Sequence, residues 1–263
     1  MTVVGHVESL WRYPVKSMRG EKLDDAFVGF SGVYGDRLYA VRNPAASAGF
    51  PYLTGRELAA MLLHRPVFRH PEAARQPPNL AAAEALGPGV TPVYAGPDDL
   101  VVDVHTPEGE VLAIDDPVLC ERLRAASSVP QPLALLRSDR AMTDCRPVSL
   151  ISLQTVAALG AEIGTALDAR RFRANMCADL GASAGFTEDG FVGRSLRIGA
   201  KAVIALVDRD PRCKMITLDP DTGQANPAIL RRVAQGHDGK AGVYGAVLVE
   251  GTVRPGDAIT LLP

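Results

Sequence analysis

The sequence predicts a mainly β protein with short helices, of the α+β class, and three observations support this. Segments with strand-like alternation outnumber the helical ones, of which there are about three. Turn signals recur at short spacing in the last third of the chain, as they do in barrels. The chain also lacks G-x-G-x-x-G and G-x-x-x-x-G-K-[ST], the phosphate-binding loops of many nucleotide-binding α/β folds. A β-barrel or mixed α+β architecture is therefore expected.

The segment before Pro66 is expected to form two strands and a short helix. Strand-like runs cover 2–11 and 36–42. Thr54 precedes Glu57 by three residues, which is the spacing of a capping box and predicts a helix start. Pro66 follows the expected end of this helix, because proline cannot continue it.

The middle of the chain is expected to hold a long excursion, a hairpin, a helix and a linker. Residues 71–97 are rich in proline and alanine and show little periodicity. Two β-rich runs within 100–115 flank the turn sequence PEGE and predict a hairpin. A short helix is expected over 116–126, a linker over 127–132, and a strand over 134–138.

The remaining chain is expected to begin with one more helix and to end in strands. Ser152 can cap a helix whose apolar residues Val156, Leu159 and Ile163 share one face. Strand-like runs then dominate, and we expect strands within 195–200, 202–208, 213–219 and 246–262.

Composition excludes several classes of protein. A chain of 263 residues can bury a substantial core without disulfides. Its 28 Lys and Arg against 30 Asp and Glu give a formal net charge of −2, which argues against a general nucleic-acid-binding protein. The sequence contains neither a signal-peptide pattern nor an apolar run long enough for a membrane span. We therefore expect a cytoplasmic protein.

The cysteines and histidines do not form a familiar metal motif. The four cysteines are widely spaced, without a C-x-x-C pair, and reduced thiols are expected. The five histidines lack the H-x-x-x-H and H-E-x-x-H spacings of zinc sites. An EF-hand loop beginning at Asp219 would need a glutamate where the chain has Leu230. The DPDTG sequence at that point is expected to form a tight turn instead.

Two basic segments in the N-terminal part are candidate anion sites. Lys16 and Ser17 follow Pro14 in a turn, where an ammonium beside a hydroxyl and exposed backbone N–H groups suits a phosphate. Arg37 follows a glycine turn and stands next to Asp36, which can simply pair with it. On spacing alone, an ordinary surface turn explains both segments equally well.

Two polar segments in the C-terminal part are further candidates. Arg173 and Asn175 are two residues apart, so in an extended segment both would point to one side, as recognition of a heterocycle or phosphate requires. Arg212 precedes Cys213, and a neighbouring positive charge favours the thiolate, a soft metal ligand. A salt-bridged strand and a buried inert cysteine are the competing interpretations.

Taken together and in this order, the candidate segments resemble the MOSC family, the group related to the C-terminal domain of molybdenum-cofactor sulfurase. The similarity is greatest to members that also carry an N-terminal β-barrel domain, such as the mitochondrial amidoxime-reducing components and their bacterial relatives. Four motifs carry it: YPVKSMRG (13–20), GDRLYAV (35–41), RFRANM (171–176) and RCKMITLDPDTG (212–223).

The resemblance implies a fold and a cofactor. It implies an N-terminal β-barrel-like domain over 1–126 and a C-terminal MOSC β-barrel over 127–263. In the reducing members, molybdenum is held by the dithiolene of a pterin that ends in a phosphate. Carried over by motif, Cys213 is the metal ligand and catalytic residue. The cofactor-binding residues implied are Lys16, Ser17, Arg37, Cys145, Arg146, Arg173, Asn175, Pro211, Arg212 and Cys213.

The resemblance also implies an activity and partners. We expect a molybdenum-dependent oxidoreductase that reduces N-hydroxylated or related small molecules by oxygen-atom transfer. Electrons would come from a separate ferredoxin-like or flavoprotein-like protein, since no cysteine cluster for an iron–sulfur domain follows the barrel. Two alternatives stay open: a sulfur-transfer protein that uses a Cys213 persulfide, and a carrier that binds the cofactor without turnover.

The chain departs from the family pattern at two motif positions. Ala174 stands where relatives have proline between the arginine and the asparagine, although both contacting side chains are kept. Met18 stands where several relatives have cysteine, and no role is assigned to it.

Overall fold

The computed structural model describes residues 1–85 and 98–263, which form two compact units. We call them the C-terminal unit, made of residues 1–12, 21–33 and 143–263, and the N-terminal unit, made of residues 13–20 and 34–142. The N-terminal strand thus belongs with the second half of the chain, because its backbone pairs with strands there. The linear domain boundary at 126/127 stays a prediction.

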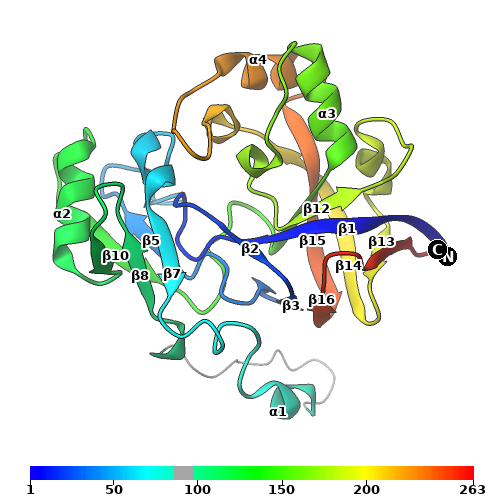
Figure 1. Cartoon of the computed structure of the whole chain (residues 1–263), viewed down its shortest axis with the longest axis horizontal. Coiled ribbons are helices and arrows are strands. Elements are labelled where there is room, and N and C mark those ends of the chain that lie inside the picture. Colours follow the sequence, from blue (N-terminus) through cyan, green and yellow to red (C-terminus); the bar gives the residue numbers. More distant parts are fainter. Residues whose placement is uncertain (86–97) are drawn as a thin grey trace. The chain divides into compact units, whose positions relative to one another are not determined.

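The C-terminal unit is built on a closed β-barrel (Figure 1). Strand β1 (Thr2–Arg12) pairs with β17 on one side and with β12 on the other, which closes a ring of seven strands. Closure leaves no open edge in this ring. The other barrel strands are β11 (Val148–Ser152), β12 (Met176–Asp179), β13 (Ser195–Ile198), β14 (Ala202–Pro211), β15 (Lys240–Val249) and β17 (Ala258–Leu261).

Strand β1 serves both neighbours because it is long and irregular. Its first half pairs with β17, with Thr2 opposite Leu261, and its second half pairs with β12, with Leu10 opposite Met176. A register shift interrupts each pairing, and such irregularities increase the local bend and twist that closure needs. A short strand, β2 (Glu21–Leu23), pairs with the end of β1.

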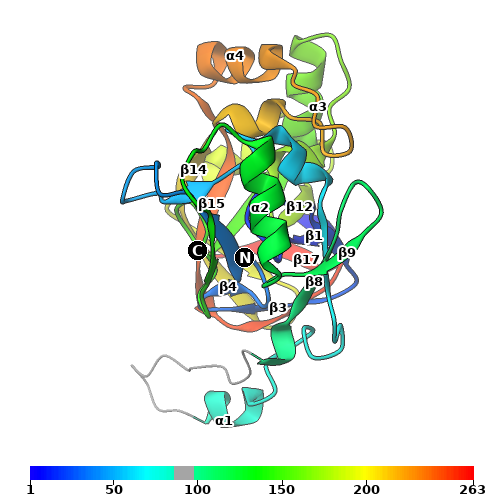
Figure 2. The ribbon, with the colours of Figure 1, turned by 90° about the vertical axis from the view of Figure 1, so that its left-hand side faces the viewer.

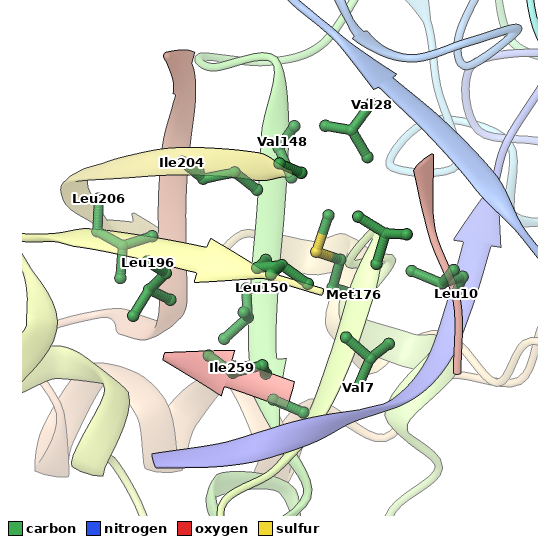
Figure 3. Packing of buried hydrophobic residues seen from close by; sticks show 14 of the residues in the cluster. Val7, Leu10, Val28, Val148, Leu150, Met176, Leu196, Ile204, Leu206 and Ile259 are labelled. Atoms are coloured by element: carbon green, nitrogen blue, oxygen red, sulfur yellow. The ribbon is translucent and has the colours of Figure 1, made fainter. Parts of the chain in front are cut away.

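Apolar side chains from the strands fill the barrel (Figure 3). Val7, Leu10, Leu150, Met176 and Ile204 are among those that are fully or almost fully buried. Burial of each large side chain contributes roughly 1.5–3 kcal/mol. A small sheet of β3 (Ala26–Gly29), β4 (Gly32–Val33) and β16 (Gly251–Val253) adds further side chains to the same core.

A second core lies between the outside of the barrel and two helices, α3 (Leu153–Glu162) and α4 (Pro227–Gly236). The two helices lie side by side (Figures 1 and 2). Glu162 of α3 bonds to Arg232 of α4 at 2.7 Å and to His237 at 2.8 Å. Cys177 of β12 is buried in this core, so its thiol is a packing group.

Three 3-10 helices, labelled η, accompany these elements in the C-terminal unit: η3 (Ala169–Phe172), η4 (Thr187–Phe191) and η5 (Lys214–Thr217). Helix η5 follows β14 after Arg212 and Cys213, and it contacts both α4 and η3. It therefore connects the barrel wall to the second core.

The N-terminal unit contains two three-stranded sheets around its own apolar core. One sheet has the order β10-β5-β6 and the other β7-β8-β9. Its elements are β5 (Tyr39–Arg42), β6 (Tyr52–Leu53), η1 (Ala59–Leu63), β7 (Arg65–Phe68), α1 (Leu80–Glu84), η2 (Asp98–Leu100), β8 (Val102–His105), β9 (Val111–Ala113), α2 (Pro117–Ala126) and β10 (Ala134–Arg137).

Most predicted elements are confirmed. The strands over 2–11 and 134–138, the hairpin within 100–115, the helix over 116–126 and the Ser152-capped helix all form. The Ser152 hydroxyl accepts a hydrogen bond from the backbone N–H of Thr155 at 3.0 Å. The class of mainly β with short helices is confirmed as well.

Two predicted elements are wrong in kind. Residues 213–219 form η5 and its C-cap rather than a strand, because the chain turns inward after Pro211 and buries Ile216 and Leu218. The Glu57 carboxylate accepts from the Thr54 N–H and hydroxyl, but the Glu57 N–H donates to the Thr54 carbonyl rather than to its hydroxyl. The pair therefore closes a turn, and the following helix is the 3-10 helix η1. Helix α4 was missed, although Asn226 as N-cap and Pro227 at the first position signal it.

Part of the predicted excursion over 71–97 can be compared with the structure. Residues 71–85 form turns and α1, and residues 86–97 lie outside the described residues. In the part of the chain that the structure describes, no helix is long and apolar enough to cross a membrane.

Gly242 of β15 should be far less tolerant of substitution than Gly239. Both have positive φ, but a Cβ on Gly242 would lie 2.7 Å from the Leu150 carbonyl oxygen, whereas one on Gly239 meets nothing within 4 Å. We expect Gly239→Ala to cost about 1 kcal/mol from backbone strain. Gly242→Ala should cost at least about 1 kcal/mol more, since overpacking adds to the strain.

Urea unfolding followed by the fluorescence of Trp11, the one tryptophan, measures this difference within the C-terminal unit. Equal losses in the free energy of unfolding of the two variants would show that the close approach of Gly242 to Leu150 does not restrict the residue type at position 242.

Cys177 should make stability fall at alkaline pH. Burial raises the pKa of its thiol to about 11, whereas an unfolded thiol has a pKa of about 8.5. The stabilising contribution is complete below pH ~8.5 and is lost as pH rises towards 11, because only the unfolded state readily releases the proton. Between pH 8 and 10.5, wild type should lose roughly 2–3 kcal/mol more than Cys177→Ala. Unfolding midpoints at the two pH values test this, and parallel losses would refute it.

Candidate functional site

In the N-terminal unit, Lys16 is held inside the unit. Its backbone N–H donates to the Tyr39 carbonyl at 2.8 Å, and its ammonium donates to the Met142 carbonyl at 2.8 Å. The ammonium also lies about 5 Å from the ring centres of Phe50 and Tyr52, at cation–π distance. Lys16 is only 4% exposed. The predicted surface turn is therefore a buried cation with an aromatic cover.

Arg37 and Lys16 are distant in sequence but bond to the same residue, Met142. The Met142 N–H donates to the Arg37 carbonyl at 2.9 Å, so one residue bonds to both Lys16 and Arg37. The Arg37 guanidinium pairs with the carboxylate of buried Asp36 and lies over the Tyr13 ring. The other Asp36 oxygen accepts from the Tyr13 N–H at 2.8 Å. The structure thus brings the two predicted basic segments together within this unit.

In the C-terminal unit, Arg173 ends η3 rather than lying on a strand. Its φ of 52° is left-handed, and its N–H bonds back to the Arg170 carbonyl. The extended segment begins only at Met176, so the expectation that Arg173 and Asn175 share one side of a strand is wrong. The left-handed conformation of Arg173 changes the chain direction between η3 and β12. The side chains of Arg173 and Asn175 therefore do not share the alternation of a strand.

Asn175 has a structural task. It is 1% exposed, and its amide oxygen accepts from the Ser149 N–H at 3.2 Å. Its amide nitrogen donates to the Trp11 carbonyl at 3.3 Å, so one side chain joins β1, β11 and the start of β12. Its contact with a cofactor stays a prediction.

Arg212 is immobilised where β14 ends. Its guanidinium donates to the carbonyls of Ala241 at 2.7 Å and Phe172 at 2.8 Å, and pairs with Asp210 at 2.8 Å. The side chain is 7% exposed and Asp210 is 3% exposed. Loss of one partner of such a buried pair commonly costs about 3–5 kcal/mol. Arg212 therefore fixes the backbone directly before Cys213.

Cys213 is the N-cap of η5 and is half-buried, in contrast to buried Cys177. A half-buried thiol next to a fixed arginine can meet a ligand, which a packed thiol cannot. Of the remaining predicted residues, Cys145, Arg146 and Pro211 are exposed, whereas Ser17 is buried. Among residues 1–85 and 98–263, no three His, Cys, Asp or Glu side chains gather as a metal site.

Tyr244 was not predicted and is tied to this corner of the barrel. Burial, followed by the nearby charge of Asp210, raises the pKa of its phenol well above the ordinary value. Tyr244 pairs in register with Asp208 of β14. A hydrogen bond between its hydroxyl and the Asp210 carboxylate also contributes to the raised pKa.

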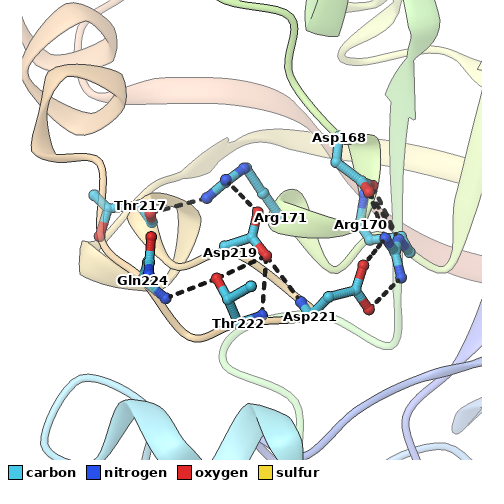
Figure 4. Close-up of polar contacts among 8 residues, drawn as sticks. All are labelled: Asp168, Arg170, Arg171, Thr217, Asp219, Asp221, Thr222 and Gln224. Atoms are coloured by element: carbon cyan, nitrogen blue, oxygen red, sulfur yellow. Dashed lines mark hydrogen bonds and ion pairs between the residues drawn. The ribbon is translucent and has the colours of Figure 1, made fainter.

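Arg170 and Arg171 were also missed (Figure 4). Arg171 bonds to the Thr217 carbonyl at 2.9 Å and to the Asp219 carboxylate at 2.7 Å. Arg170 pairs with Asp168 and with Asp221. Arg171 opens the RFRANM motif and Arg170 precedes it, which was the available signal, but charge alone does not reveal that the partner of Arg171 lies 46 residues away.

The DPDTG segment is the predicted tight turn. One oxygen of Asp219 accepts from the N–H groups of Asp221 at 3.1 Å and Thr222 at 3.0 Å. Although partial burial opposes the effect, these hydrogen bonds and the nearby Arg171 lower the pKa of Asp219. The turn therefore presents a carboxylate that is ionised at neutral pH to Arg171.

Strained backbone coincides with the predicted site residues. In the described residues, five non-glycine residues have positive φ: Ser17, Arg37, Arg173, Phe186 and Asp238. Such residues are uncommon, cost of order 1–3 kcal/mol each, and gather at functional sites. Three of these five, Ser17, Arg37 and Arg173, are predicted cofactor-binding residues.

Comparisons with known proteins agree with the motif pattern. A model of the MOSC domain matches residues 137–260, and a model of the MOSC N-terminal beta barrel domain matches residues 4–115. A search of the curated proteins found no match.

Matches among solved structures include the YUAD protein from Bacillus subtilis, with 12% identity and a TM-score of 0.47. The match covers 98% of this chain and 94% of that chain. YiiM from Geobacillus stearothermophilus has 21% identity and a TM-score of 0.36, with 45% of this chain covered. YiiM from Escherichia coli has 20% identity and a TM-score of 0.34, again over 45% of this chain. The chain spans 55% of each YiiM chain.

Those TM-scores are all below 0.5, so the assignment rests on the two family models, which together cover both halves of the chain. The chain belongs to the MOSC family, which is linked to binding of the molybdenum cofactor, and carries the MOSC N-terminal β-barrel domain.

Proposed function

We propose that this chain is a molybdenum-cofactor oxidoreductase that reduces N-hydroxylated or related N–O or S–O compounds. The observation that carries the proposal is the left-handed backbone at Ser17, Arg37 and Arg173. These residues come from three separate motifs. Strain is retained where it orients a side chain for a ligand.

The donor set fits such a cofactor. Cys213 offers a half-buried sulfur, and thiolate is a soft ligand suited to a sulfur-bound metal. Arg37 and Arg173 offer guanidinium groups, which bind phosphate and other planar anions with two hydrogen bonds. Lys16 supplies a point charge, although its aromatic cover must yield before the ammonium meets an anion.

The chain's own residues have distinct tasks in this proposal. Cys213 donates its sulfur to the metal and does not act as a nucleophile. Arg212, held by two carbonyls and Asp210, keeps the Cys213 backbone in place. The bound cofactor supplies oxygen-atom transfer and electron storage. The electrons come from a separate electron-transfer protein.

Removal of the Cys213 thiol tests the proposal. The full chain is produced in a host that makes the cofactor, and molybdenum, pterin fluorescence and turnover of an amidoxime with a reduced dye are measured. Wild type should hold stoichiometric molybdenum. Cys213→Ala should lose turnover by at least about 100-fold, since even residues behind metal ligands cost 10–100-fold.

Cys120→Ala is the matched control, because this half-buried thiol lies in the N-terminal unit and burial raises its pKa. It should retain wild-type turnover. Wild-type protein without molybdenum, or Cys213→Ala with full activity, would contradict the proposal. A persulfide found on Cys213 would favour sulfur transfer instead.

A further inference from the structure

We infer that Arg171 is a positioning residue for Cys213: it locks the η5 turn that carries the cysteine onto η3. The inference rests on the proposed role of Cys213 as metal ligand for its functional meaning, but the lock itself is a property of the protein. Arg171 is not among the residues that the motif pattern assigns to the cofactor.

The lock is a pair of arginine-to-carbonyl bonds that run in opposite directions. Arg171 of η3 donates to the carbonyl of Thr217, the last residue of η5. Arg212, just before η5, donates to the carbonyl of Phe172, the last residue of η3. Cys213 lies in the short span between Arg212 and Thr217. Its backbone is therefore tied to η3 at both ends.

At the Thr217 end of this span, further hydrogen bonds and burial hold the chain in place. The Thr217 carbonyl also accepts from the Asn226 N–H at 2.8 Å, and Arg171 extends its second nitrogen to Asp219 (Figure 4). Ile216, Thr217 and Leu218 are all at most 3% exposed. A charged donor bonded in such a dry environment contributes more than one at the surface. The Arg171 bonds are thus a strong restraint on η5.

Residue type matters at position 171. A guanidinium holds its N–H groups in a rigid fork, so Arg171 can bond to the Thr217 carbonyl and the Asp219 carboxylate at once. A lysine keeps the charge but presents a single nitrogen on a flexible stem. Arg171→Lys should therefore preserve only part of the restraint.

Arg170 provides a matched control one residue away. It lies in the same 3-10 helix and pairs with carboxylates, but its partners Asp168 and Asp221 are partly exposed side chains. Neither Asp168 nor Asp221 belongs to η5. Exposed pairs of this kind are worth little. Arg170→Ala should leave η5 and Cys213 as they are.

The test uses the full chain made in a host without the cofactor, so that its outcome does not depend on molybdenum. Hydrogen exchange is followed at the amides of Ile216 and Leu218, which close η5, with β15 amides as reference. Arg171→Ala should exchange about tenfold faster at η5 alone, because bonds from a charged donor are lost. In Arg171→Lys the exchange rate at η5 should lie between those of wild type and Arg171→Ala, and in Arg170→Ala it should equal that of wild type.

Alkylation then reports on the thiol itself. The rate at Cys213 relative to exposed Cys145 should rise severalfold in Arg171→Ala, be partly restored in Arg171→Lys and stay unchanged in Arg170→Ala, while buried Cys177 stays unmodified. Unchanged exchange and alkylation in Arg171→Ala would overturn the inference, as would equal effects of Arg170→Ala. Modification of Cys177 or faster exchange throughout β15 would mean general unfolding and would also overturn it.

The cofactor-loaded protein separates this inference from the proposed function. If wild type binds molybdenum, Arg171→Ala should retain less of it than Arg170→Ala does. Absence of molybdenum from wild type would refute the proposed function, while the exchange and alkylation results would still decide the role of Arg171.

Discussion

The guanidinium of Arg212 is the interaction on which the candidate site depends. Three groups hold it: the carbonyls of Ala241 and Phe172 and the carboxylate of Asp210. The first comes from β15, the second from η3 and the third from β14, so a single side chain joins two barrel strands to the helix that precedes Arg173. Because it is almost fully buried, the joint is stiff. Cys213 is the next residue along the chain.

Barrel closure makes that joint possible. Strand β1 pairs with both β12 and β17, so the sheet cannot open and β14 and β15 keep their register. Gly242 lets the Arg212 guanidinium and the Leu150 carbonyl approach β15 closely. The position of the Cys213 thiol therefore depends on buried Arg212, and the position of Arg212 depends on the pairing of the barrel strands.

The N-terminal unit contributes two cations, Lys16 and Arg37, which are held by backbone bonds and aromatic rings. Lys16 and Arg37 are both attached to Met142, and each also lies near an aromatic ring. Ser17 and Arg37 hold left-handed conformations. A near-neutral protein with a formal net charge of −2 thus concentrates cations locally and keeps them in fixed positions.

Local signals in the sequence predicted local structure well. The capping bond of Ser152, the bonds from Thr54 to the Glu57 carboxylate and the hairpin around Gly109 depend on residues a few positions apart, and all of them form. Family motifs predicted which residues carry the site. Positive φ at Ser17, Arg37 and Arg173 then supplied a structural reason for that choice.

The sequence was uninformative wherever a partner is distant. The apolar residues of 213–219 suggested a strand, yet burial against α4 and η3 turns them into a 3-10 helix. Lys16 gave no sign of its cover by Phe50 and Tyr52. Arg171 and Thr217 are joined across 46 positions, and no local pattern reports such a bond. These contacts are decided by tertiary packing, which overrides local preference.

The central claim is that a sulfur of this chain binds the metal, and X-ray absorption at the molybdenum edge tests it most directly. Cofactor-loaded wild type and Cys213→Ser differ only in the atom offered at this position. The account predicts one sulfur neighbour fewer around molybdenum in the variant, with the pterin still bound. An identical sulfur shell in both proteins would contradict it.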